Sequence, residues 1–271
     1  MDFDEFFEDE PQQDKPRDPA IDLARDHLKQ LFEKSPLRLF YSTQIETSLE
    51  RQFFHWITGK ALLELATEKQ IQRRTVLIQE QAINFYASRK HRYIQRGLKI
   101  MRGVLERLFD PEFTHAIGRH GELMFDAALG RFGFRAEARN VATWQGRSWI
   151  ETGHNLDRII TRDGVAYGVE IKNTQNYISR EELLVKIRMC QTLQLKPLFI
   201  MRFAPKSYVY DVYKSGGFTL LFENQLYPWG HGRLLEDARI RLGLKVHCPK
   251  DVQEGDTQRF VNWHEKNAPR H

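Results

Sequence analysis

Cysteines and long apolar runs are scarce in this sequence. Cys190 and Cys248 are the two cysteines of the 271-residue chain and no CxxC pair occurs, so we expect neither a disulfide framework nor a thiolate zinc site. We predict two free, buried thiols. No run approaches the roughly 18 apolar residues of a membrane span, and the N-terminus is acidic where a secretory signal would be basic. These absences predict a cytoplasmic protein with no membrane partner, and the absence of GxxxxGK[ST] leaves it without an ATPase motif.

Charge is unevenly distributed along an ordinary globular composition of 41% hydrophobic, 12% aromatic and 28% charged residues. Residues 1–20 hold eight acidic and two basic side chains without periodicity, which predicts an acidic disordered tail. Ten basic residues lie between Lys69 and Arg107, against two acidic ones. This density indicates a polyanionic partner, with a solvated helix face as the alternative. The residues expected to bind nucleic acid are Arg73, Arg74, Arg89, Lys90, Arg92, Arg96 and Lys99.

Residues 21–112 have the pattern of a mainly helical domain. The predicted elements are a helix with an apolar stripe over 21–32, a helix that starts at a capping box at 43–46 and continues to Ile57, a helix over 60–68, strands at 75–78 and 83–86, and an amphipathic basic helix over 94–108. Three helices, a hairpin and a basic helix resemble a winged helix-turn-helix, which would bind DNA. An unrelated helical bundle is the alternative.

Residues 113–271 show a mixed pattern of helix and strand, which indicates the α/β (α+β) class. In order, the predicted elements are a helix carrying Glu122, strands at 134–144, 156–161 and 165–172, a helix opened by the capping box Ser179–Glu182, and a strand at 197–203. The segments 208–213, 219–222 and 234–241, the last a helix, are expected to be edge elements or a cover. The central order is α-β-β-β-α-β.

The dipeptide Asp163-Gly164 predicts a two-residue turn between two strands, because a type I′ turn requires positive φ at both positions. With Arg162 opposite Val165, antiparallel register places Asp157 directly opposite Glu170, and Lys172 emerges on the same face. Opposed carboxylates repel each other unless a cation lies between them. Two hard oxygen ligands, with water and phosphate completing the shell, suit Mg²⁺.

Asp157, a 12-residue interval and then Glu170-Ile171-Lys172 resemble the D-xn-ExK motif of the PD-(D/E)xK nuclease superfamily, which includes restriction endonucleases and Holliday junction resolvases. The resemblance covers about residues 113–205, with Leu156 where the family has proline before the aspartate. It implies a restriction-endonuclease-like αβββαβ core. It also implies that Asp157, Glu170 and the Ile171 carbonyl bind Mg²⁺, with Mn²⁺ as a substitute, and that Lys172 assists the attacking water.

The same resemblance implies roles for residues outside the motif. Glu122 would orient a metal-bound water or Lys172, with Asp126 as a rival for its place. Gln191 and Lys186, on the helix after the motif, would face the site, with Gln191 as a catalytic residue; ordinary solvated positions are the alternative. Many superfamily members act as homodimers so that both strands are cut, and a homodimer is therefore expected.

The sequence thus predicts a Mg²⁺-dependent DNA endonuclease with an acidic tail over 1–20, a winged-helix-like domain over 21–112 and a nuclease domain over 113–271. Three alternatives stay open. One is a non-catalytic DNA-binding protein or subunit that uses a nuclease-like scaffold. Another is an RNA nuclease, because nothing in the motif reports on the 2′-hydroxyl. In the third, Asp157, Glu170 and Lys172 form a surface salt-bridge ladder.

Overall fold

The computed structural model describes residues 17–268, and the mixed α/β class is confirmed. These residues form two compact units, residues 17–75 with 84–94, and residues 76–83 with 95–268. The division falls at Ile94, ahead of the boundary predicted after residue 112. Residues 1–16 of the predicted acidic tail lie outside the described residues, and the first helix already begins at Pro19. None of the described helices is both long and apolar enough to span a membrane.

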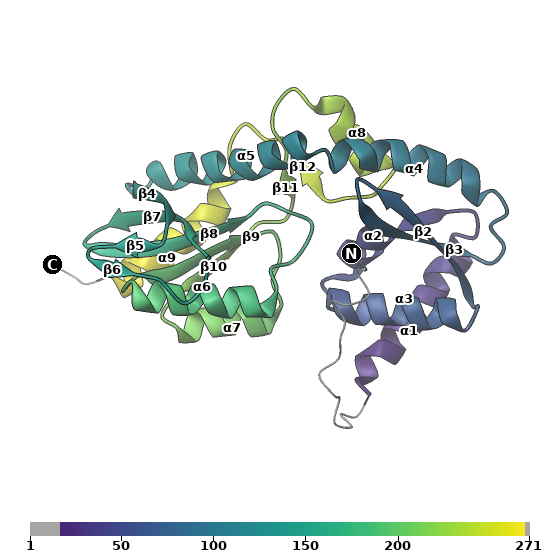
Figure 1. The fold of residues 1–271 in the computed structure, drawn as a ribbon, viewed down its shortest axis with the longest axis horizontal. Coiled ribbons are helices and arrows are strands. Elements are labelled where there is room, and N and C mark those ends of the chain that lie inside the picture. The colour runs from purple at the N-terminus through teal and green to yellow at the C-terminus, as the bar shows by residue number, and fades with distance from the viewer. Residues whose placement is uncertain (1–16, 269–271) are drawn as a thin grey trace. The chain divides into compact units, whose positions relative to one another are not determined.

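The first unit combines three helices with a three-stranded sheet (Figure 1). Its elements are α1 (Pro19–Lys34), β1 (Leu39–Tyr41), α2 (Ser42–Leu49), α3 (His55–Thr67), β2 (Ile71–Ile78) and β3 (Gln81–Ser88). The sheet order is β1-β3-β2, and the tip of the β2–β3 hairpin, residues 76–83, groups with the second unit. Apolar side chains of α1, α2 and α3 form the core, including the fully buried Leu28, Ile45 and Leu62.

Two local predictions in this unit are wrong. The second helix begins at Ser42 rather than at a cap on Thr43, because the Tyr41 backbone N–H donates to the Gln44 side chain at 3.4 Å. It ends at Leu49, and α3 begins at His55, so the apolar positions from Ile45 to Ile57 belong to two helices. Strand β1 was not predicted, since its three residues are stabilised by pairing with the distant β3.

The second unit is built on a five-stranded sheet of order β10-β9-β8-β7-β4. Its elements are α4 (Ile94–Leu108), α5 (Pro111–Gly130), β4 (Arg135–Val141), β5 (Thr143–Trp144), β6 (Arg147–Ser148), β7 (Leu156–Arg162), β8 (Val165–Lys172), α6 (Arg180–Thr192), β9 (Lys196–Met201), α7 (Lys206–Lys214), β10 (Phe218–Leu221), β11 (Gln225–Leu226), α8 (Gly232–Ile240), β12 (Val246–His247) and α9 (Glu254–Asn267). Strands β4, β7 and β8 are antiparallel neighbours, whereas β8, β9 and β10 run parallel. The predicted order α-β-β-β-α-β is present as α5, β4, β7, β8, α6 and β9, with the small β5–β6 hairpin inserted.

Helices cover both faces of this sheet, with α5 on one side and α6 and α7 on the other (Figure 1). Strand β8 alternates between the two layers. Val165, Tyr167 and Val169 pack with α5 and α9. Gly168 faces α6, where an added Cβ would lie 2.6 Å from the Cys190 sulfur. Cys190 is buried as predicted, but Cys248 is partly exposed, which corrects the prediction of two buried thiols.

The predicted turn and register of the β7–β8 hairpin are confirmed. Asp163 and Gly164 both have positive φ, 50° and 71°, and Arg162 pairs with Val165. Helix α9 braces this hairpin from the end of the chain. The buried His264 ring contacts the Tyr167 hydroxyl at 2.6 Å and the Asp163 carboxylate at 3.1 Å. The hairpin therefore has a register set by its turn and held by a distant helix.

Candidate active site

The β7–β8 hairpin brings Asp157 beside Glu170. Arg158 pairs with Val169, so the next step of the antiparallel register puts the two carboxylates opposite each other. One oxygen of Asp157 accepts the Ile171 backbone N–H at 2.7 Å. Burial raises the pKa of Asp157 to about 6, and the negative charge of Glu170 adds to the effect. The hairpin thus disfavours the ionised form of the Asp157 side chain.

Glu170 is 2% exposed and held by two lysines. Lys172 contacts one carboxylate oxygen at 3.0 Å, and Lys186 contacts the other at 2.6 Å. Lys186 is itself buried and also donates to the carbonyl oxygen of Asn155, two residues before Asp157. Lys186 therefore connects helix α6 to β8 and to the residue that precedes β7.

Lys172 lies on the same face and forms a second ion pair, with Glu182 of α6 at 2.8 Å. Burial alone lowers the pKa of Lys172, but the two carboxylate partners outweigh it, so the pKa lies above the ordinary value and the amine is protonated. The predicted cap of α6 is confirmed in part. Ser179 accepts the Glu182 backbone N–H at 3.0 Å, whereas the Glu182 carboxylate binds Lys172 instead of closing the capping box.

Glu122 lies on α5 and pairs with Arg158 at 2.6 Å rather than with Lys172. Arg158 also binds Asp126 at 3.0 Å and donates to the Asp157 carbonyl oxygen at 2.9 Å. Glu122 and Asp126, the two candidates for the same role, therefore both pair with the buried Arg158. Arg158 in turn donates a hydrogen bond to the backbone of Asp157. A cavity of about 320 Å³ lies beside this cluster and is also lined by the exposed Arg119 and Arg139.

Gln191 is not brought to the site. It is exposed near the end of α6, five residues after Lys186, which corresponds to about 140° around a helix. Of the two α6 residues named from the sequence, Lys186 is the one that reaches Glu170. Glu182 was not predicted as a site residue. Its i,i+4 spacing from Lys186 was the available signal, because that spacing places both side chains on one helical face.

The basic residues predicted to bind nucleic acid are exposed in both units. In the first unit, Arg73 and Arg74 lie on β2, and Arg89, Lys90 and Arg92 follow β3. In the second unit, Arg96 and Lys99 lie on α4, whose other face buries Ile94, Leu98 and Met101. Arg73 is partly held by a hydrogen bond to Asn84 at 3.0 Å.

The charges of the site fit a divalent cation. Asp157, Glu170 and Glu182 face Lys172 and Lys186, which leaves one net negative charge. Asp157 has a carboxylate oxygen that accepts no hydrogen bond from the described residues. Within residues 17–268 no cluster of three or more histidine, cysteine or acidic side chains forms a metal site. A two-carboxylate arrangement suits Mg²⁺, which keeps several of its waters.

Comparisons of this chain with family models, with curated proteins and with solved structures find no match.

Proposed function

We propose that this protein is a Mg²⁺-dependent DNA endonuclease of the PD-(D/E)xK type. The observation that carries the proposal is the β7–β8 hairpin, which opposes Asp157 and Glu170 and presents Lys172 on the same face. The sheet that holds this hairpin has the element order expected of a restriction-endonuclease-like core. Within the described residues, Asp157 has no cationic side chain paired with it and faces the negative charge of Glu170, so a metal-binding role accounts for its position.

Asp157, Glu170 and the Ile171 carbonyl would hold the metal, Mg²⁺ or Mn²⁺. The bound ion would polarise the phosphate and lower the pKa of a water. Asp157 would be ionised above about pH 6 and available as a ligand. Lys172 would place its positive charge beside the phosphate, and Lys186 would hold Glu170 in position. Glu122 would act through Arg158 on the Asp157 backbone.

The first unit would be the DNA-binding module. Its helix and strand order, with the β2–β3 hairpin as the wing, supports a winged helix-turn-helix. The exposed basic residues of β2 and of the segment after β3 would neutralise phosphates, and Arg96 and Lys99 of α4 would do so from the second unit. Because one site cuts one strand, we propose that two copies act together on a duplex. We propose the cytoplasm as the location.

A non-catalytic DNA-binding scaffold is the second candidate. Both oxygens of Glu170 are already paired with lysines, and this arrangement neutralises the carboxylate without a metal. In such a protein the hairpin would have a structural role only. The two candidates differ in one measurable property, which is metal-dependent cleavage.

The test is cleavage of duplex, branched and single-stranded DNA and of RNA in Mg²⁺, Mn²⁺ or EDTA. We expect Asp157→Asn and Glu170→Gln to abolish metal-dependent cutting, and Lys172→Met to lower it by about 10²–10³-fold because the transition state loses one stabilising charge. Glu181→Gln and Lys250→Met are matched controls, since both residues are exposed and lie outside the site.

DNA affinity in EDTA must stay unchanged in all five variants for the result to count. Cutting by the wild type that survives Asp157→Asn contradicts the proposed site. If no substrate is cut while DNA binding is intact, the scaffold candidate replaces the nuclease.

A further inference from the structure

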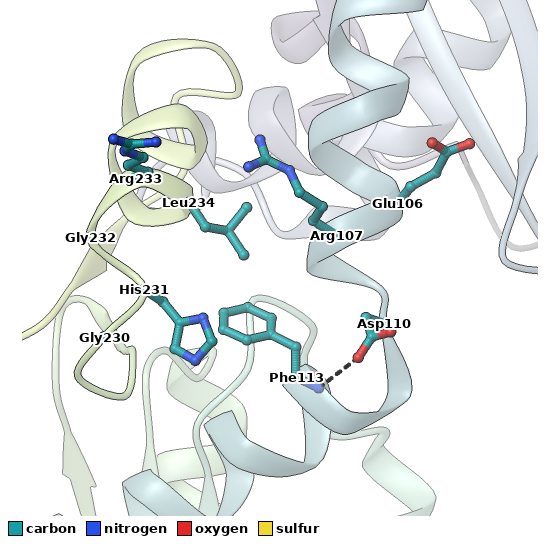
Figure 2. A pocket seen from close by; sticks show the side chains of 9 residues that line it. All are labelled: Glu106, Arg107, Asp110, Phe113, Gly230, His231, Gly232, Arg233 and Leu234. Carbon is teal, nitrogen blue, oxygen red and sulfur yellow. Dashed lines mark hydrogen bonds between the residues drawn. The ribbon is translucent and has the colours of Figure 1, made fainter.

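A separate cavity of about 760 Å³ lies in the second unit, where the end of α4 and the start of α5 meet the loop before α8. Its surface is mainly apolar and aromatic. Figure 2 shows the rings of Phe113 and His231 side by side, with Leu234 and Arg107 above them and Glu106 extending away. The ring centroids of Phe113 and His231 are 4.7 Å apart. Phe113 is buried, whereas His231 is exposed.

Two charged groups that line this cavity, Asp110 and Arg233, form no ion pair with another side chain of the described residues. Glu106 pairs with Arg102 at 2.7 Å, and Asp110 caps α5 through the Phe113 backbone N–H at 3.0 Å. Arg107 pairs with Asp237. Arg233 is exposed, and no acidic side chain in residues 17–268 pairs with it. The cavity therefore has two aromatic rings on its wall and an exposed guanidinium at its edge, beside the carboxylates of Glu106 and Asp110.

This combination matches a single nucleotide. An exposed aromatic ring stacks on any nucleobase, and a guanidinium binds phosphate oxygens. The volume lies within the range of ordinary small-ligand sites. Gly230 and Gly232 leave open space at the cavity wall, because an added Cβ at either position would meet no atom within 4 Å.

The loop that carries His231 is anchored to the strand that carries Lys172. Asn173, the residue after Lys172, donates its side-chain amide to the Leu226 carbonyl and accepts the Leu226 N–H, both at 2.7 Å. Gly121 permits this contact, since a Cβ there would lie 2.6 Å from the Asn173 Cβ. The cavity and the candidate active site therefore share one structural anchor within the same unit.

We propose that this cavity binds one unpaired nucleotide of a DNA strand, with its base on His231 and its phosphate on Arg233. The inference deepens the proposed nuclease function, on which it rests, by naming its substrate as a duplex with an unpaired nucleotide. A fully paired strand keeps its bases stacked in the helix and leaves the cavity unused.

The experiment measures binding of the full chain, in EDTA, to a labelled duplex with one bulged nucleotide and to the same duplex fully paired. We expect about tenfold tighter binding to the bulged duplex. His231→Ala and Arg233→Ala should each remove most of this preference and leave binding to the paired duplex unchanged. His231 makes no side-chain capping bond to α8, so its removal costs the helix little. Arg239→Ala, an exposed arginine of α8 outside the cavity, is the matched control.

Equal affinity of the wild type for the two duplexes overturns the proposal, as does a bulge preference that survives both cavity variants. The outcome is separable from the nuclease test. A bulge preference that depends on His231, without cleavage of any substrate, supports the cavity and rejects the nuclease. Metal-dependent cleavage without a bulge preference supports the nuclease and rejects the proposed nucleotide site in the cavity.

Discussion

At the scale of single residues, Asp157 and Glu170 occupy similar places with different partners. Glu170 is compensated by two lysines, whereas Asp157 accepts a backbone N–H and faces the negative charge of Glu170. The cost of opposing the buried Glu170 and the partly buried Asp157 therefore falls on Asp157. Such a raised pKa at a polar, partly accessible position is typical of functional sites.

Asp157→Asn is predicted to stabilise the metal-free protein at high pH. A carboxyl whose folded pKa is raised from 3.8 to about 6 stabilises the fold fully below pH 3.8 and loses that contribution as the pH rises through 6. The loss in the wild type amounts to about 3 kcal/mol at most. Urea unfolding in EDTA should show Asp157→Asn gaining stability relative to the wild type between about pH 4 and pH 7, with a constant difference at higher pH. Excess Mg²⁺ should stabilise the wild type alone.

Asp163→Asn is a control whose stability effect should have the opposite pH dependence. The hydrogen bond from His264 holds the pKa of Asp163 below its ordinary value, so the Asp163 carboxylate contributes stability above that value and loses it at acid pH.

A stability difference between Asp157→Asn and the wild type that does not change with pH would contradict the assignment of a strained carboxylate.

At the scale of elements, helix α6 organises the site. Glu182, Lys186 and Cys190 follow at intervals of four residues, so a single helical face supplies a partner for Lys172, a partner for Glu170 and the packing contact with β8. The small residues Ala166 and Gly168 on this face of β8 pack against α6. The approach of α6 to the sheet therefore determines the distance from Lys186 to Glu170.

Gly168→Ala is predicted to destabilise the protein by about 1–3 kcal/mol, because the new methyl group would overlap the Cys190 sulfur and Leu156. The measurement is the midpoint of urea unfolding. Gly118→Ala is the matched control, since Gly118 lies within α5 and a Cβ there meets nothing within 4 Å. The control should be neutral or stabilising by up to about 1 kcal/mol. Equal effects of the two substitutions would show that α6 does not pack closely on β8.

At the scale of the whole molecule, basic charge is the main property that points to nucleic acid. The chain has a formal net charge of +5 despite eight acidic residues among the first twenty. The exposed arginines and lysines are shared between the two units. Binding through phosphate contacts releases counterions, so affinity must fall steeply as salt rises.

Replacing Arg73, Arg74, Arg89 and Lys90 with glutamine should lower the slope of log affinity against log salt by about 0.9 for each phosphate that is no longer neutralised. The measurement is fluorescence anisotropy of a labelled duplex over a series of salt concentrations. Replacing Lys34, Arg239, Lys250 and Lys266, which are exposed elsewhere, is the charge-matched control. The assignment of the basic surface is wrong if both quadruple variants reduce the slope equally.

The sequence alone determined those features that depend on neighbouring residues. The Asp163-Gly164 turn defined the register of β7 and β8, because positive φ at both positions is a local requirement. The apolar stripe of α4 and the Ser179 cap of α6 were likewise predictable from local periodicity and capping. For this reason the opposition of Asp157 and Glu170 follows from the order of residues around a single turn.

The tertiary structure alone decided which distant groups complete the site. Lys186, rather than Gln191, pairs with Glu170. The Glu182 carboxylate pairs with Lys172 instead of closing the capping box, and Glu122 pairs with Arg158. Strand β1 and the bracing of the hairpin by His264 also depend on segments far apart in the chain. Local propensities carry no information on such contacts, because the packing of helices against the sheet sets which side chains lie within hydrogen-bonding distance.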